Sequence, residues 1–366
     1  MALSWIVAGG GTGGHVTPAL ALGEAIVARG DRVLFVGSEH GLEARLVPAA
    51  GFELVSLPSQ QVMGRGLLGR LRGVLSILGA VGPARRALGG VGADIVLTVG
   101  GYAAMPVVLA AWLTRTPLAL INPDSIPGRV NRLSAPLAKR IYVGFESAAE
   151  RLSSRRVTAR FTGIPLRASM IEAFAGRTRR RPEPPFHLLV AGGSQGARQL
   201  NDAMMDALPR LADQPLEVFH QSGAADRERV AEAYAKAGVA AEVVAFASDM
   251  PARYAWADLA LCRVGAVTCA ELALSGLPAL LVPYPHAADD HQTVNAAELE
   301  AAGAARRLDP ATLDGPRVVR ELCELFEAPD VLTRMSEAAT RRARPRAASE
   351  IVEDCAALTD PAGDRR

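Results

Sequence analysis

The chain has 366 residues, a length that predicts about two domains. Apolar residues make up 49% of it and the formal net charge is +2, so it can build sizeable hydrophobic cores and has no charge excess that points to nucleic acid. Aromatic residues account for only 5%, which also argues against platforms for stacking bases.

The cysteines and the N-terminus indicate a reduced, intracellular setting. The four cysteines lie in one half of the chain and form no C-x-x-C pair, so we expect neither a zinc site nor a disulfide framework. The first residues have no basic region before their apolar run and lead straight into a predicted strand, which is not the pattern of a signal peptide. The apolar runs, such as residues 105–113, are too short to span a bilayer.

The first predicted unit is a strand at residues 5–7, a glycine-rich turn at residues 8–15 and a helix at residues 19–28. Glycine permits positive φ and a close approach of the backbone to a ligand, and the exposed amides of a helix start favour an anion such as phosphate. The turn contains a Gly-x-Gly-x-x-Gly spacing, but the second strand, at residues 32–36, is not followed by the acidic residue that a dehydrogenase needs. A tight structural turn is the other interpretation.

A basic amphipathic stretch follows the next predicted strand, at residues 52–57. Residues 62–89 mix bulky apolar side chains with arginines, and no acid occurs between Glu53 and Asp94. Two interpretations remain open: a helix packed on the sheet, or a surface that lies on an anionic membrane. The candidate membrane-facing residues are Leu67, Leu68, Arg70, Leu71, Arg72 and Leu75.

The remainder of the first half alternates strands with helices, which predicts a parallel sheet. Strands are expected at residues 93–99, 117–121 and 140–143, with a further glycine turn at residues 100–106 and a helix at residues 107–114. The proline-rich and arginine-rich residues 177–185 are predicted to be a solvated linker.

The second half repeats the same construction, roughly 180 residues after the first glycine turn. A strand at residues 186–191 leads into the glycine turn at residues 191–197 and a helix at residues 197–212. The other predicted elements are strands at residues 216–220, 242–246, 258–262 and 277–283, and helices at residues 226–237, 249–256, from 265 and around 295.

The predicted fold class is therefore α/β, with two Rossmann-like parallel-sheet domains that face each other across a cleft. We place the domains at residues 1–164 and 165–366, with the last helix, at about residues 343–358, packing back on the first domain.

The second domain has the features of a nucleotide site. Ligands of open α/β sheets lie beyond the carboxyl ends of the strands, where the turn at residues 193–196 and the helix start at residues 265–268 offer backbone amides. Glu271 could accept hydrogen bonds from ribose hydroxyls, or be an acid stabilised by the helix dipole. No Asp-x-Asp pair is present, so we expect no essential metal and a pyrophosphate stabilised by helix N-termini.

Three side chains complete the candidate site. His15 ends the first glycine turn at a helix start, where it could act as a general base or as a structural hydrogen-bond donor. His291 and Gln292, after the strand at residues 277–283, could hydrogen-bond sugar hydroxyls.

The ordered set of motifs resembles the MurG family of peptidoglycan glycosyltransferases, which have the GT-B fold. The matching segments are residues 9–15 (GGGTGGH), 99–102 (VGGY) with Pro106, 192–197 (GGSQGA), 220–223 (HQSG), 254–258 (YAWAD), 262–263 (CR) with 265–266 (GA) and 268–271 (TCAE), 282–285 (VPYP) and 289–292 (DDHQ) with Asn295.

The resemblance implies that N-acetylglucosamine moves from its UDP ester to the 4-hydroxyl of the muramyl sugar of lipid I, with inversion, to give lipid II for cell-wall growth, cell shape and division. It also implies an enzyme on the cytoplasmic face of the cell membrane, with UDP-N-acetylglucosamine, lipid I, an anionic membrane surface and other cell-wall synthesis proteins as partners. By the same resemblance, His15 is the candidate base or a phosphate ligand, and Glu271 contacts the ribose. The implied substrate-binding residues are Thr12, Gly13, Gly14, Asp124, Arg167, Ser194, Gln195, Gly265, Ala266, Val267, Thr268, Glu271, His291 and Gln292.

The sequence departs from the family at three places. Residues 121–124 read INPD instead of His-Glu-Gln-Asn, residues 163–165 read GIP instead of Gly-Asn-Pro, and residues 263–265 read RVG instead of Arg-Ser-Gly. Asp124 can accept a hydrogen bond but cannot donate one as an amide does. Alternatives are therefore a transferase with another lipid acceptor, a UDP-N-acetylglucosamine 2-epimerase, or a binding protein without turnover.

Overall fold

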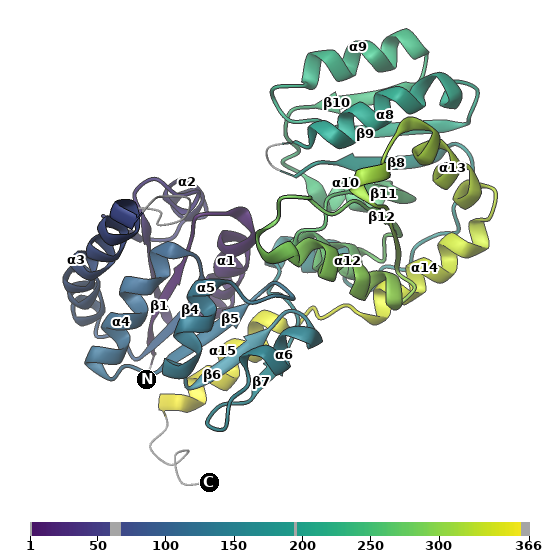
Figure 1. Ribbon diagram of the computed structural model, residues 1–366. Helices are drawn as coiled ribbons and strands as arrows, with labels where there is room; N and C mark the ends of the chain where they lie inside the picture. The colour runs from purple at the N-terminus through teal and green to yellow at the C-terminus, as the bar shows by residue number, and fades with distance from the viewer. Residues whose placement is uncertain (1, 59–66, 194–195, 360–366) are drawn as a thin grey trace. The chain divides into compact units, whose positions relative to one another are not determined.

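The computed structural model describes residues 2–58, 67–193 and 196–359 (Figure 1). The chain divides into two compact units, an N-terminal unit of residues 1–168 and 344–366 and a C-terminal unit of residues 169–343. Each unit contains one parallel sheet with helices, so the α/β class predicted from the alternation of strands and helices is confirmed.

The sheet of the N-terminal unit has the order β3-β2-β1-β4-β5-β6-β7, and all neighbouring strands are parallel. Its strands are β1 (Ser4–Gly9), β2 (Arg32–Ser38), β3 (Leu54–Leu57), β4 (Ile95–Gly100), β5 (Leu118–Asn122), β6 (Arg140–Val143) and β7 (Ala159–Phe161). The central strands are nearly continuous apolar runs because helices cover both faces of a parallel sheet.

Seven α-helices of the described residues belong wholly to this unit. They are α1 (Gly13–Ala28), α2 (Glu43–Ala49), α3 (Leu67–Val91), α4 (Met105–Thr114), α5 (Arg129–Ser134), α6 (Glu146–Leu152) and α15 (Ala347–Ala356). Alternate residues of β1 point to opposite faces: Trp5 and Val7 share a buried cluster with α1 and α15, whereas Ile6 and Ala8 share one with α3 and α4.

The last helix, α15, is attached to this sheet by a buried hydroxyl. Tyr142 of β6 donates from Oη to Asp354 Oδ2 at 2.5 Å, and burial raises the pKa of this phenol, so it remains a donor. Arg160 Nη1 lies 2.9 Å from the other oxygen of Asp354. The helix therefore extends the core of a unit whose other elements precede residue 169.

The sheet of the C-terminal unit has the order β10-β9-β8-β11-β12-β13, again all parallel. Its strands are β8 (Phe186–Ala191), β9 (Leu216–Gln221), β10 (Ala240–Val244), β11 (Leu259–Cys262), β12 (Ala279–Leu281) and β13 (Ala305–Arg307). Both sheets thus contain the 3-2-1-4-5-6 order of a dinucleotide-binding fold, in which ligands bind where the order reverses. The reversal points lie between β1 and β4 and between β8 and β11.

The α-helices of the C-terminal unit are α7 (Ala168–Phe174), which begins at the unit boundary, α8 (Arg198–Leu211), α9 (Arg227–Ala237), α10 (Met250–Trp256), α11 (Ala266–Ser275), α12 (His291–Ala301), α13 (Gly315–Phe326) and α14 (Pro329–Arg341). Four of them, α8, α9, α13 and α14, form one large apolar cluster with β8, β9, β11 and β12. Across the described parts of both units, no helix combines the length and apolar character needed to cross a membrane.

Several short elements differ from the sequence prediction. Strand β10 begins two residues earlier than predicted, because Ala240 pairs with Glu217 of β9. Strands β7 and β13 were not predicted; each has three residues and includes arginine, and each lies at a sheet edge, where polar side chains reach solvent.

The prediction that residues 177–185 are solvated is wrong for one arginine. Arg179 is partly buried and its guanidinium donates to the backbone carbonyls of Tyr254, Ser275 and Ala257. Burial lowers the pKa of Arg179 to about 10. Arg179 therefore satisfies carbonyl groups at the ends of α10 and α11, a role that only the tertiary contacts reveal.

Replacing the buried hydroxyl of Tyr142 tests the attachment of α15. Tyr142→Phe should lower the free energy of unfolding by about 1–2 kcal/mol, since the hydroxyl's contacts with Asp354 and Cys355 are lost while Asp354 keeps Arg140 and Arg160. Urea unfolding of this variant measures the loss, and Tyr284→Phe, at a 45% exposed tyrosine, is the matched control. Equal stability of the two variants would contradict the attachment.

Candidate active site

Two glycine turns meet at the reversal point of the N-terminal sheet. Strand β1 ends at Gly9, which pairs with Gly100 at the end of β4. Gly11 and Gly101 have φ values of 90° and 84°, and a Cβ on Gly101 would lie 2.2 Å from the carbonyl oxygen of Gly10. The two turns are thus in backbone contact, which only glycine allows.

The start of α1 presents the predicted residues together. Thr12 is the N-cap with an extended backbone, and its side chain caps no helix amide. Its Oγ1 lies 3.0 Å from Nδ1 of half-buried His15. The first amides of α1, including those of Gly13 and Gly14, have no acceptor within the helix, so this end suits an anionic group.

The loop after β5, which contains Asp124, is held by two buried asparagines. Asn131 Nδ2 donates to Asn122 Oδ1 at 2.9 Å, and Asn122 Nδ2 donates to the carbonyl oxygen of Asp124 at 2.6 Å. Asn122 and Asn131 are 1% and 3% exposed. The loop that departs from the family motif is therefore fixed by amide hydrogen bonds at the carboxyl edge of the sheet.

In the C-terminal unit, the glycine turn after β8 rests on the loop after β9. Gly193 and Gly196 have φ values of 83° and 75°, and a Cβ on Gly196 would lie 2.2 Å from the carbonyl oxygen of Ser222. Ser194 and Gln195, two predicted donor-site residues, lie outside the described residues.

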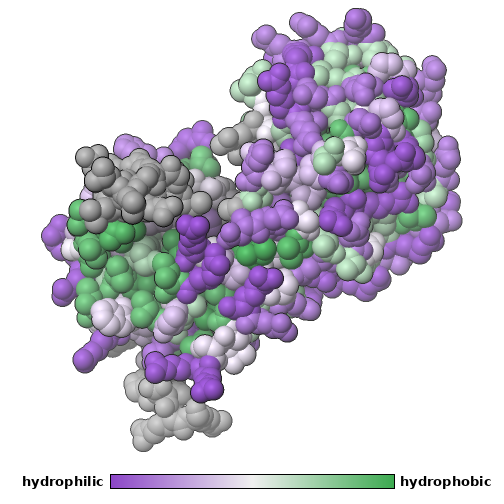
Figure 2. All heavy atoms as spheres, viewed as in Figure 1, coloured by the Kyte–Doolittle hydropathy of each residue, from purple (hydrophilic) through white to green (hydrophobic). Residues whose placement is uncertain are grey.

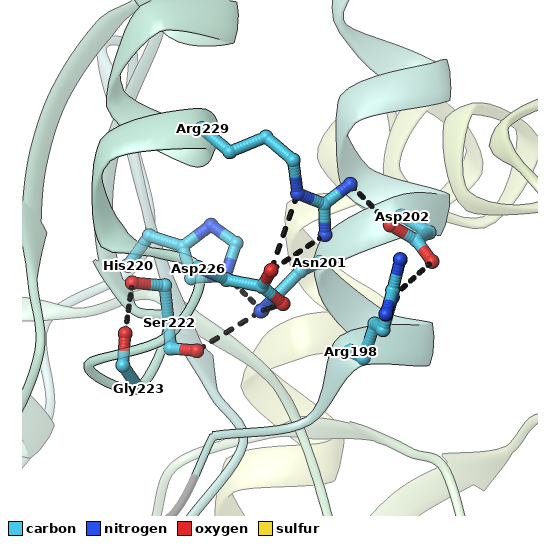
Figure 3. A network of polar contacts seen from close by, with 8 residues as sticks. All are labelled: Arg198, Asn201, Asp202, His220, Ser222, Gly223, Asp226 and Arg229. Carbon is cyan, nitrogen blue, oxygen red and sulfur yellow. Dashed lines mark hydrogen bonds and ion pairs between the residues drawn. The ribbon is translucent and has the colours of Figure 1, made fainter.

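A polar network supports the loop on which this turn rests (Figure 3). Asn201 of α8 donates from Nδ2 to the carbonyl oxygen of Ser222 at 2.9 Å and to Asp226 Oδ2 at 2.8 Å. Asp226 pairs with Arg229 at 2.9 Å. His220 contacts Asn201 Oδ1 at 3.0 Å, and burial lowers its pKa to about 3, so this histidine of the predicted motif is a neutral, fully buried support.

The N-termini of α11 and α12 are joined at the end of β11. Gly265 is the N-cap of α11, which begins with Ala266, Val267 and Thr268. Gln292 of α12 accepts through Oε1 from the amide of Val264 at 3.4 Å and from that of Tyr284 at 2.9 Å. His291 is the first residue of α12, so the predicted sugar residues and the predicted phosphate turn lie in one neighbourhood.

Glu271, the predicted ribose ligand, lies half-buried on α11 and accepts a hydrogen bond from Tyr254 Oη at 2.9 Å. Burial raises the pKa of Glu271 to about 7, against a smaller lowering by the Tyr254 hydroxyl. Tyr254 was part of a recognised motif without an assigned role, because a tyrosine in a helix gives no sign of its partner.

Arg167, the other predicted donor ligand, is engaged within the N-terminal unit. Its Nε lies 2.5 Å from Glu24 Oε1, and the second oxygen of Glu24 accepts from the amide of Ala168 at 2.8 Å. Glu24 belongs to α1, the helix that carries His15.

Two further side chains at these edges were missed by sequence reasoning. Arg263 donates to the carbonyl oxygens of Val282 and Pro283 at 3.2 and 2.8 Å and so ties the ends of β11 and β12 together. Glu43 is a fully buried carboxylate beneath the first glycine turn, 2.8 Å from the amide of Gly11. Arg263 belongs to a recognised motif in which it had no assigned role, and Glu43 was not singled out, since charged residues are ordinarily exposed.

The structure contains no cluster of three or more histidine, cysteine, aspartate or glutamate side chains suited to a metal within residues 2–58, 67–193 and 196–359.

Two Rossmann-like units with glycine turns at their reversal points define the GT-B class of glycosyltransferases, and the comparisons with known proteins agree. Family models of the glycosyltransferase family 28 N-terminal and C-terminal domains match residues 5–143 and 187–351. The chain belongs to glycosyltransferase family 28, and the resemblance found in its motifs is confirmed.

Similar proteins match nearly the whole chain. The UDP-N-acetylglucosamine–N-acetylmuramyl-(pentapeptide) pyrophosphoryl-undecaprenol N-acetylglucosamine transferase of Anaeromyxobacter sp. (strain Fw109-5) is 42% identical, over 99% of this chain and 96% of the relative. The protein of the same name from Acidithiobacillus ferrooxidans (strain ATCC 53993 / BNL-5-31) is 42% identical, over 97% and 98%. The crystal structure of Acinetobacter baumannii MurG has a TM-score of 0.79 at 30% identity, over 97% and 99%.

The raised pKa of Glu271 predicts a pH-dependent stability. Between the unperturbed value of 4.5 and about 7 the folded protein binds more protons than the unfolded chain, so the free energy of unfolding falls as pH rises through this window and is level above it. The unmodified protein should lose about 1–3 kcal/mol of unfolding free energy between pH 5 and pH 8 through this carboxyl group. In Glu271→Gln this loss should be absent.

Thermal unfolding at pH 5 and pH 8 provides the measurement. Glu242→Gln, at an exposed glutamate paired with Arg253, is the control and should keep the pH dependence of the unmodified protein. If Glu271→Gln also keeps it, the carboxyl group of Glu271 does not have a raised pKa.

Proposed function

We propose that this protein is an inverting glycosyltransferase that moves N-acetylglucosamine from UDP-N-acetylglucosamine to the 4-hydroxyl of the muramyl sugar of lipid I, producing lipid II. The observation that carries the proposal is the 42% identity, over 99% of the chain, to a transferase named for this reaction. The glycine turns at both reversal points support it, since each offers backbone amides to a diphosphate.

The donor belongs to the C-terminal unit in this proposal. The amides at the start of α11, from Gly265 to Thr268, and those of the turn that includes Ser194 and Gln195 would bind the diphosphate. Glu271 would accept hydrogen bonds from the ribose, while His291 and the Nε2 group of Gln292 would contact the sugar. The Oε1 atom of Gln292 already accepts two backbone amides, which fixes the direction of Nε2.

The reaction needs one proton transfer and one displacement. His15 would remove the proton from the 4-hydroxyl of the acceptor as that oxygen attacks the anomeric carbon. The bond from that carbon to the UDP oxygen breaks, UDP leaves with the bonding electrons, and the anomeric configuration inverts. Charge on the departing diphosphate would be stabilised by helix N-termini, without an essential metal.

The N-terminal unit would face the lipid acceptor, with Thr12, Gly13, Gly14 and Asp124 near its diphosphate and sugar. Arg167, which pairs with Glu24, is a further UDP ligand in this proposal.

An exposed apolar patch supports a peripheral position on a membrane (Figure 2), which the proposed reaction would place on the cytoplasmic face. The patch consists of Val74, Leu75 and Leu78 of α3 and Trp112 and Leu113 of α4, each about half exposed. Arg85, Arg86 and Arg115 are exposed on the same two helices or at their ends, an arrangement that suits anionic headgroups. The side chains of Leu67, Leu68, Arg70, Leu71 and Arg72, predicted to join this surface, lie outside the described part of the chain.

Product analysis with a panel of acceptors tests the reaction. The protein is incubated with UDP-N-acetylglucosamine and, separately, a lipid I analogue, diacylglycerol or no acceptor, and the products are identified by mass spectrometry. The proposal expects one added N-acetylhexosamine on the lipid I analogue alone. Three results would exclude the proposal. Transfer to diacylglycerol would indicate a transferase with another lipid acceptor, and epimerised UDP-sugar without acceptor would indicate a 2-epimerase. Donor binding without any product would indicate a binding protein without turnover.

His15→Ala separates the proposed base from a phosphate ligand. Turnover with saturating substrates should fall about 10²–10⁴-fold while the Kd for UDP stays unchanged, because only the proton transfer is lost. His40→Ala, at an exposed histidine of the same unit, is the control and should retain full turnover. Weaker UDP binding with normal turnover at saturation would assign His15 to the phosphates instead.

Charges placed in the apolar patch should weaken membrane binding. The double variant Leu75→Asp with Leu78→Asp is expected to bind anionic vesicles about tenfold or more weakly, since two half-exposed leucines leave the surface that would insert. Vesicle co-sedimentation measures this, and Phe246→Asp, at a 60% exposed phenylalanine of the C-terminal unit, is the control. Equal loss of binding in both variants would contradict a specific role of the patch.

A further inference from the structure

A buried carboxylate lies beneath the first glycine turn. Glu43, the first residue of α2, is 0% exposed. Its Oε2 accepts from the amide of Gly11 at 2.8 Å, and its Oε1 accepts from the amide and the hydroxyl of Ser38 at 2.9 and 2.6 Å. Within the described residues its partners are these donors and no cationic side chain, so the buried group is stabilised by oriented dipoles at a helix start.

The surrounding backbone is shaped to the carboxylate. A Cβ on Gly10 or Gly41 would lie 2.2 or 2.1 Å from an oxygen of Glu43, and a Cβ on Gly37 would lie 2.5 Å from its Cγ. Three glycines therefore leave the space that this side chain fills. Such close packing on three sides determines the position of the carboxylate as strongly as its hydrogen bonds do.

The same cluster joins the ends of three adjacent strands. Ser38 is the last residue of β2, and Tyr102 follows β4. The Oγ atom of Ser38 lies 3.3 Å from the Oη atom of Tyr102. The ring of Tyr102 covers Gly11, because a Cβ there would lie 3.2 Å from Cε1. Strands β2, β1 and β4 are neighbours in the sheet, so Glu43, Ser38 and Tyr102 form one support for both glycine turns.

This arrangement separates two kinds of amide in the turn. The amide of Gly11 is bonded to Glu43, so it is not available to a substrate. The amides that can receive an anion are those at the start of α1, beyond Thr12.

We propose that Glu43 is a positioning residue for the acceptor side of the reaction. By holding the Gly11 amide and filling the space under the turn, it fixes the direction in which α1 begins and thereby the place of His15 and of the Gly13 and Gly14 amides. Glu43 acts through this turn and does not touch the substrate. This inference rests on the proposed function in so far as it assigns the turn to the acceptor.

Glu43→Gln is the most direct test. It keeps the volume of the side chain but places an NH2 group against one of the three groups that donate to Glu43, the Gly11 amide and the Ser38 amide and hydroxyl. We expect kcat to fall and the KM for a lipid I analogue to rise, with kcat/KM lower by about tenfold or more, whereas the KM for UDP-N-acetylglucosamine stays within about twofold. The imidazole proton signals of His15 in the NMR spectrum should shift as well.

Glu321→Gln is the matched control. Glu321 is 5% exposed and pairs with Arg306 and Arg317 at 3.0 and 2.8 Å in the C-terminal unit, so its loss should reduce thermal stability without moving either KM or the His15 signals. If Glu43→Gln behaves like this control, its role is structural only and the proposal is overturned.

Two further results keep the outcomes distinct. If Glu43→Gln does not fold, Ser38→Ala takes its place as the test. It removes one donor to Glu43 and the contact with Tyr102, so kcat and the KM for the lipid I analogue should change in the same direction by a smaller amount. If the unmodified protein transfers nothing to the lipid I analogue, the proposed function fails, and the His15 signals alone decide whether Glu43 positions the turn.

Discussion

Both units depend on close backbone contact between two loops at the carboxyl ends of neighbouring strands. At the reversal point of the N-terminal sheet, a Cβ on Gly101 would lie 2.2 Å from the carbonyl oxygen of Gly10, and at the ends of β8 and β9 a Cβ on Gly196 would lie 2.2 Å from the carbonyl oxygen of Ser222. This closeness allows two turns to share the narrow carboxyl edge of a sheet and leaves helix-start amides directed outward. The anion binding that we propose for these turns would follow from that geometry rather than from the net charge, which is only +2.

The two units keep these turns in place by different polar groups. In the N-terminal unit a buried carboxylate, Glu43, accepts backbone and hydroxyl donors, and every one of its described partners is uncharged. In the C-terminal unit an amide, Asn201, donates to a carbonyl and to Asp226, and the charge of Asp226 is balanced by Arg229 near the surface. In both units, a buried donor or acceptor left unpaired beneath the turn would destabilise the fold by more than the net free energy of the hydrogen bond. A substitution that changes a single donor or acceptor atom of Glu43 or Asn201 should therefore have a large effect.

The sequence predicted the parts of this design that depend on local pattern. Apolar strands followed by glycine turns were recognised because period and turn chemistry are local, and the motif order led to the correct family. The roles of Glu43, Tyr254 and Arg179 were not predicted, since each depends on partners that only the folded chain brings near. Short edge strands such as β7 and β13 were missed for the same reason: three residues carry too little pattern, and pairing with a neighbouring strand decides their structure.

The central claim is that both substrates must be present for UDP to leave, with charge on the diphosphate stabilised by helix N-termini and not by a metal. The most direct measurement is the rate of UDP release from UDP-N-acetylglucosamine in a chelator, with and without a lipid I analogue. The account predicts rapid release only when the acceptor is present, at a rate that the chelator leaves unchanged. Release that is equal without acceptor, or that the chelator abolishes and a divalent metal restores, would contradict it.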